Sequence, residues 1–86
     1  MCKWPKLVRY DPIEVHWDDI SSISTWNSEE DADNIEPTKC TSVGYYLNRN
    51  DGALRISYSK NDNGGFSVEV IPAGCVTKII VLGRRR

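Results

Sequence analysis

Alternation of apolar and polar residues predicts five β-strands in this chain of 86 residues. The expected strands are 13–17, 40–48, 53–60, 66–71 and 76–82. The first alternates strictly, which is typical of a half-buried strand with Ile13, Val15 and Trp17 directed inward. The last is apolar on both faces, which indicates that both of its faces are covered.

Residues with special backbone preferences separate the later strands. Asp51-Gly52 supplies the positive φ angles of a tight hairpin, and 61–65 predicts a second, looser turn. Pro72-Ala73-Gly74 predicts a one-turn break before the last strand. We expect Gly74 to adopt a backbone conformation that other residues enter only at a cost.

The alternation also predicts which side chains form the core. The residues expected to face inward on the later strands are Val43, Tyr45, Leu47, Leu54, Ile56, Tyr58, Phe66, Val68, Val70 and Ile79. The order is one strand, a long loop, three strands in hairpin succession, a short break and a last strand. This order predicts an all-β, five-stranded SH3-like or Sm-like barrel, whose closure removes exposed strand edges.

The chain length fits one small domain over residues 1–86, with a core from about 12 to 82 and a flexible arginine tail. A polar stretch at 18–38 interrupts the strand pattern. Ile20, Ile23 and Trp26 are spaced by three and predict either one short helical turn or a folded loop that packs on the barrel. Ser28 precedes three acidic residues and predicts the start of a single helical turn. Loops of this length in small domains are often functional.

Composition narrows the classes of function. The net charge is −1, so the overall balance does not favour binding to nucleic acid or anionic lipid. No signal peptide or membrane-spanning segment is expected. Cys2, Cys40 and Cys75 are odd in number and lack CxxC spacing, so we expect reduced thiols, no zinc and no cofactor.

The first candidate site lies where the first strand enters the long loop. Trp17 beside Asp18 and Asp19 combines an aromatic surface with two acceptors, which suits a cation, an amine or an arginine of a partner. The structural alternative is that Trp17 packs in the core while the aspartates cap loop amides. Trp26 has polar neighbours, and we expect it to cover one end of the barrel or to bind a partner.

The second candidate site lies on the hairpin. Tyr45 and Tyr46 point to opposite faces, and an exposed Tyr46 with Arg55 across the hairpin could stack on a nucleotide. His16 is the only histidine, and its spacing from Cys40 does not indicate a nucleophile with a base. We therefore expect no enzymatic activity.

Four short motifs give the chain a resemblance to small β-barrel proteins encoded by tailed bacteriophages and prophages. They are 15–19, Trp26, 40–47 and 71–79, and together they cover most of residues 12–82. The resemblance implies a phage origin, a small barrel and a place in the cytoplasm of the bacterial host cell. Accessory proteins of this class often bind a host protein or sequester a small molecule.

Two function classes follow, and both remain open at this point. The first is a non-enzymatic binding protein that contacts a host protein or a small nucleotide-like ligand through Trp17, Asp18, Asp19 and Trp26. The second is an Sm-like protein that binds nucleic acid through Tyr46, Arg49, Arg55 and the terminal arginines. A minor virion or assembly component is a third possibility. We expect a homo-oligomer that covers the apolar last strand, with no membrane partner.

Overall fold

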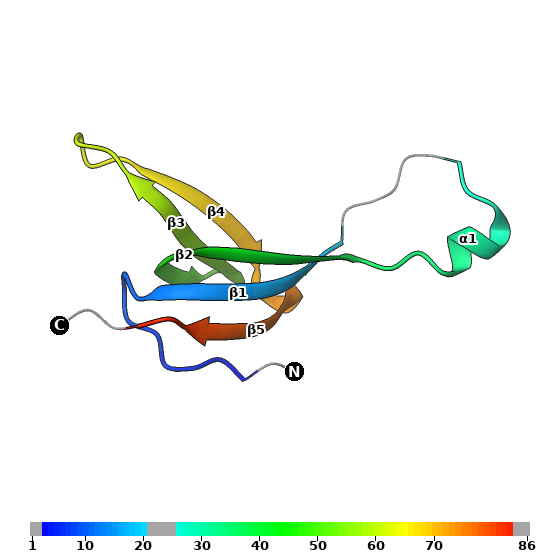
Figure 1. Cartoon of the computed structure of the whole chain (residues 1–86), viewed down its shortest axis with the longest axis horizontal. Helices are drawn as coiled ribbons and strands as arrows, with labels where there is room; N and C mark the ends of the chain where they lie inside the picture. The colour runs from blue at the N-terminus through cyan, green and yellow to red at the C-terminus, as the bar shows by residue number, and fades with distance from the viewer. Residues whose placement is uncertain (1–2, 21–25, 84–86) are drawn as a thin grey trace.

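The computed structural model describes residues 3–20 and 26–83 of the chain (Figure 1). The elements in chain order are β1 (Pro12–Asp19), α1 (Glu29–Asp33), β2 (Thr38–Asn50), β3 (Ala53–Lys60), β4 (Phe66–Pro72), the 3-10 turn η1 (Ala73–Cys75) and β5 (Val76–Val81). All five predicted strands are confirmed, and so is the helical turn after Ser28, whose Oγ accepts the Asp31 N–H at 3.1 Å.

The five strands form one antiparallel sheet with the order β4-β3-β2-β1-β5. The expected closed barrel is wrong, because β4 and β5 each pair on one side only and leave two open edges. The sheet curls so that β4 and β5 face each other through side chains. Sheet layers that pack through side chains lie about 10 Å apart, whereas hydrogen-bonded strands lie about 4.8 Å apart. Because β4 and β5 pack through side chains, they are too far apart to close the barrel by hydrogen bonds.

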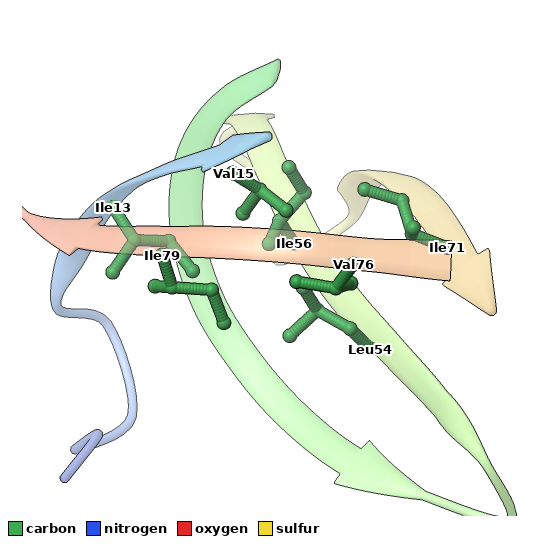
Figure 2. Packing of buried hydrophobic residues seen from close by; sticks show 7 residues of the cluster. All are labelled: Ile13, Val15, Leu54, Ile56, Ile71, Val76 and Ile79. Carbon is green, nitrogen blue, oxygen red and sulfur yellow. The ribbon is translucent and has the colours of Figure 1, made fainter. Parts of the chain in front are cut away.

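The core lies on the concave face of this curled sheet. Figure 2 shows seven buried residues from four strands that point toward one another. They are Ile13, Val15, Leu54, Ile56, Ile71, Val76 and Ile79. The inward direction predicted for Ile13, Val15, Leu54, Ile56 and Ile79 is thus confirmed. The amino-terminal segment adds Trp4 and Leu7, which pack against this cluster.

The predicted inner faces of β2 and β4 are wrong. Ile71 pairs with the buried Leu54, so Ile71 faces inward. Alternation from this pair places Glu69 on the inner side of β4 and residues 66, 68 and 70 on the outer side. On β2, Gly44 and Tyr46 occupy the inner side. The residues predicted inside but found exposed are Val43, Tyr45, Tyr58, Phe66, Val68 and Val70. Leu47 is buried as predicted, at a bulge in the β2–β3 pairing.

The turns follow the sequence closely, with one exception. Asp51 and Gly52 have φ angles of 52° and 73°, as a tight hairpin requires. The one-turn break before β5 is confirmed as η1. Gly74 is not among the glycines with positive φ, and a β-carbon there would meet no atom within 4 Å, so its predicted special conformation is wrong.

The segment that carries α1 projects away from the sheet (Figure 1). The expected packing of this loop on the sheet is wrong for Ile20 and Trp26, which are both exposed, as is Ile35. Ile23, Cys2 and the terminal arginines lie outside the described residues. The loop therefore contributes no apolar cover to the core through its described residues.

Candidate functional site

A shallow pocket of about 180 Å³ opens on the outer face of the sheet, near the β3–β4 turn. It is lined by Tyr10, Tyr45, Ser57, Ser59, Lys60 and Phe66. Three aromatic rings, two hydroxyls and one ammonium group thus converge on one small hollow. This set combines apolar contact area with a few placed polar groups, as small-molecule sites do.

Tyr10 reaches the pocket from a strained turn. Its φ is 74°, a left-handed conformation that is rare for a bulky residue. The Asp11 N–H donates to the Val8 carbonyl at 2.9 Å, and the Val8 N–H donates to Asp11 Oδ2 at 2.9 Å. The Tyr10 N–H in turn donates to the Tyr46 carbonyl at 2.6 Å. Such a conformation costs about 1–3 kcal/mol and persists only where its surroundings hold it, commonly at binding sites.

The aromatic rings of Tyr10 and Phe66 form one wall of the pocket. Their centroids lie 6.2 Å apart and their planes differ by 19°, which is a stacked arrangement. Lys60 Nζ lies 5.9 Å from the Phe66 ring centroid. No carboxylate within the described part of the chain forms an ion pair with Lys60. Its ammonium group can therefore meet an anionic substituent of a ligand.

A bulge in β3 shapes the floor of the pocket. The β3–β4 register shifts between Ser57 and Lys60. Ser57 is buried although it faces outward, and its hydroxyl donates to the Ser59 carbonyl at 3.0 Å. The Ser59 N–H donates to Ser67 Oγ at 3.0 Å across the bulge. These bonds fix the serine side of the pocket and leave its other side to the rings.

Tyr58 occupies the opposite face of β3 from the pocket. Desolvation by burial raises the pKa of Tyr58 to about 12, with smaller contributions from a hydrogen bond to Glu69 and from the negative charge of that carboxylate. The Tyr58 side chain is half exposed, so this desolvation is partial and local to its contacts on the inner side of the sheet.

Two of the predicted site residues line a separate and smaller hollow of about 130 Å³ at the other end of the sheet. Trp17 and Asp18 lie there beside Lys39, which is paired with Asp18 in the β1–β2 register. The Trp17 side chain also packs against the core, and its Nε1–H donates to Ser42 Oγ at 3.1 Å. Asp19 pairs with Thr38 next to this hollow. These contacts agree with the structural alternative for Trp17.

The remaining predicted site residues are dispersed over the molecule. Trp26 lies in the projecting loop with a relative exposure of 102%, so it covers no end of the sheet. Tyr46, expected to be exposed, packs against the core instead, while its neighbour Tyr45 is exposed. Arg55 donates to Asn48 Oδ1 at 3.1 Å and to the Asn50 carbonyl at 3.2 Å. Tyr46 and Arg55 therefore do not form a joint stacking site.

Arg49, which was also predicted for the nucleic-acid surface, contacts another part of the chain. The Arg49 guanidinium lies 4.0 Å from the centroid of the Trp4 ring. This contact has the geometry of a cation–π interaction and ties β2 to the amino-terminal segment. Arg49 thus contacts the amino-terminal segment while its side chain remains exposed.

His16 lies on the outer face of β1 with both ring nitrogens engaged. Its Nε2 lies 2.7 Å from Glu14 Oε2, and its Nδ1 lies 3.5 Å from Thr41 Oγ1. His16 and Glu14 meet because residues two apart on a strand share a face. The Cys40 thiol donates to the Thr38 carbonyl at 3.7 Å.

Comparison of the chain with family models, curated proteins and solved structures finds no match in any of the three. Within residues 3–20 and 26–83, no three His, Cys, Asp or Glu side chains are grouped to hold a metal. No helix in those same ranges is long and apolar enough to cross a membrane.

The sequence pattern predicts none of the six residues of the outer pocket as site residues. The pattern places Tyr45 and Phe66 in the core and Lys60 at a strand end, and it gives Tyr10 no role in a site. Two features of the sequence could have pointed to the pocket. The turn residues Asp11 and Pro12 follow Tyr10, and three of the five residues in 66–70 are apolar. Bringing these residues together required the strand register, which the sequence pattern does not contain.

Proposed function

We propose that this protein is a non-enzymatic binding protein that holds a small, planar, anionic ligand of nucleotide-like chemistry in the outer pocket. The observation that carries the proposal is the convergence of Tyr10, Tyr45 and Phe66 with Lys60 in one hollow. Aromatic faces stack on a heterocycle, and a lysine attracts a phosphate as a point charge.

The size of the pocket favours a ligand with one ring system. Its volume of about 180 Å³ is below the roughly 300–1,000 Å³ of sites that enclose drug-sized molecules. A nucleobase would occupy the hollow, and the sugar and phosphate would extend toward Lys60. The ligand would be only partly enclosed, so we expect modest affinity.

We further propose that the protein is a phage accessory protein acting in the cytoplasm of the bacterial host. Support comes from the motifs that resemble phage-encoded proteins. An SH3-like or Sm-like relationship of the sheet belongs to the same proposal. It is supported by the strand order, with β1 between β2 and β5, and by the one-turn break before β5.

The experiment is a titration of the full chain with the four common nucleoside monophosphates, followed by amide and aromatic NMR shifts. We expect saturable shifts at Tyr10, Tyr45 and Phe66, and at least tenfold weaker binding by Tyr45→Ala. Tyr58→Ala is the matched control, because Tyr58 is 50% exposed and Tyr45 47%, yet only Tyr45 lines the pocket.

The role of Lys60 has its own comparison. Lys60→Gln should weaken binding of a nucleoside monophosphate more than binding of the corresponding nucleoside, which lacks the phosphate. Absence of saturable shifts with all four monophosphates would contradict the proposal. Equal weakening by Tyr45→Ala and Tyr58→Ala would also contradict it, because the effect would then not depend on the pocket.

A further inference from the structure

The open edge of β4 combines free main-chain groups with an apolar stripe. Ala73 N–H donates to the Gly52 carbonyl at 2.8 Å, one position beyond the Ala53–Pro72 pair. Main-chain groups of successive strand residues alternate in direction. Residues 69 and 71 therefore bond to β3, while residues 66, 68 and 70 direct their N–H and C=O groups to the open edge.

The same three residues carry the exposed apolar side chains of β4. Phe66, Val68 and Val70 are all exposed on the outer face of the sheet. Natural edge strands usually carry a lysine, a proline or a bulge that prevents pairing with another chain. Within β4 the only proline is Pro72, at its end, the register shift lies in β3, and residues 66–70 contain no lysine. Their one charged residue is Glu69, which two-fold pairing about Val68 places opposite a serine.

The residues of β4 are symmetric about Val68 in their polarity. The order from 66 to 70 is apolar, polar, apolar, polar, apolar. Antiparallel pairing with a second copy across a two-fold axis at Val68 places Phe66 opposite the partner's Val70. It also places Glu69 opposite the partner's Ser67, so that no like charges face each other.

Glu69 supplies an independent observation in favour of this pairing. Its Oε1 is buried and accepts no hydrogen bond from any residue that the structure describes, although the same carboxylate also interacts with Tyr58. In the two-fold pairing Glu69 and the partner's Ser67 form a non-hydrogen-bonded pair, the closer of the two kinds. Ser67 Oγ accepts the Ser59 N–H and also lies 3.1 Å from Ser59 Oγ. When the Ser59 hydroxyl donates in that contact, the Ser67 hydroxyl hydrogen can be directed to Glu69 of the other copy.

We infer that the protein forms a two-fold homodimer in which the β4 edges of two copies pair antiparallel about Val68 and extend the sheet across both. The interface contains about six main-chain hydrogen bonds, from residues 66, 68 and 70 of each copy. It differs from the self-association through the last strand predicted from the sequence. The inference does not depend on the ligand of the outer pocket.

The first test measures the oligomeric state of the full chain by sedimentation velocity over a range of micromolar concentrations. We expect a monomer–dimer equilibrium, and Val68→Lys should weaken it at least tenfold, because two ammonium groups would meet at the axis. The matched control is Val43→Lys. Val43 is 52% exposed and Val68 46%, but Val43 lies on β2, two strands away from the β4 edge.

The second test locates the interface in the unmodified chain by residue-resolved amide hydrogen exchange. We expect protection of the Val68 and Val70 amides to increase with protein concentration. A monomer at high micromolar concentration would overturn the inference. A dimer whose concentration-dependent protection lies in Val76–Val81 would overturn it as well, because the last strand would then be the interface. If Val68→Lys does not fold, the exchange measurement still decides between these outcomes.

Discussion

Gly44 and Ser57 approach each other so closely across β2 and β3 that a β-carbon built on Gly44 would lie 2.8 Å from the Ser57 carbonyl oxygen. Gly44 lies on the inner face, opposite the buried Ile13 of β1. A glycine inside a strand often marks such a close backbone approach or a tight bend. The curl that brings β3 and β4 over β1 and β5 therefore depends on this missing side chain.

Gly44→Ala should destabilise the protein by about 1–3 kcal/mol, because the added methyl group forces the backbone of β3 to move. The measurement is a urea unfolding curve followed by circular dichroism. Gly74→Ala is the control, since nothing lies within 4 Å of a β-carbon there, and its stability should equal or slightly exceed that of the unmodified chain. Equal losses in the two variants would contradict the close approach.

Substitutions of two neighbouring residues can test which face of β4 is buried. Ile71→Ala should destabilise the protein by about 2–5 kcal/mol, because Ile71 is fully buried in the core cluster. Val70→Ala should change stability by no more than about 0.5–1 kcal/mol, because the side chain of Val70 is exposed. The reverse order in thermal or urea unfolding would mean that the sequence-based assignment of the faces was right.

The ionisation of Tyr58 gives a prediction at high pH. Its pKa is raised from 10.0 to about 12, so the folded protein holds this proton more strongly than the unfolded chain. Stability from this group is thus complete below pH 10 and is lost as the pH rises toward 12. The phenolate absorbance of the unmodified chain minus that of Tyr58→Phe reports this titration.

Removing the neighbouring carboxylate separates the causes of that shift. Glu69→Gln should lower the pKa of Tyr58 toward 10.0 without reaching it, because desolvation is the largest cause and persists in the variant. An unchanged titration in Glu69→Gln would show that the carboxylate has no influence on the phenol.

Trp17, in β1, and Trp26, within the long loop, differ in their environment. Trp17→Phe should cost about 1 kcal/mol, because it removes the hydrogen bond to Ser42 Oγ from a side chain packed on the core. Trp26→Phe should leave stability within about 0.5 kcal/mol, because Trp26 is fully exposed. It should also remove the emission component that acrylamide quenches most strongly. A stability loss at Trp26 equal to that at Trp17 would indicate a packed loop.

Local chemistry was sufficient to locate the strands and turns. The alternation in Ile13–Trp17 and Ala53–Lys60 and the Asp51-Gly52 dipeptide act within a few residues, so their structural effect is visible without knowledge of the fold. The same holds for Ser28, whose cap needs only the next three residues. These elements appear in the structure at or near their predicted bounds.

The tertiary structure alone decided which faces of β2 and β4 are buried and where the candidate site lies. Both strands carry apolar residues in both phases, so alternation cannot choose between Val70 and Ile71 or between Tyr45 and Tyr46. The choice comes from pairing with strands distant in sequence, as when Leu54 meets Ile71. That register turns Tyr45 and Phe66 outward and brings them to Tyr10, which a strained turn holds in place. Because a one-residue slip reverses a strand's faces, core and site both depend on long-range pairing.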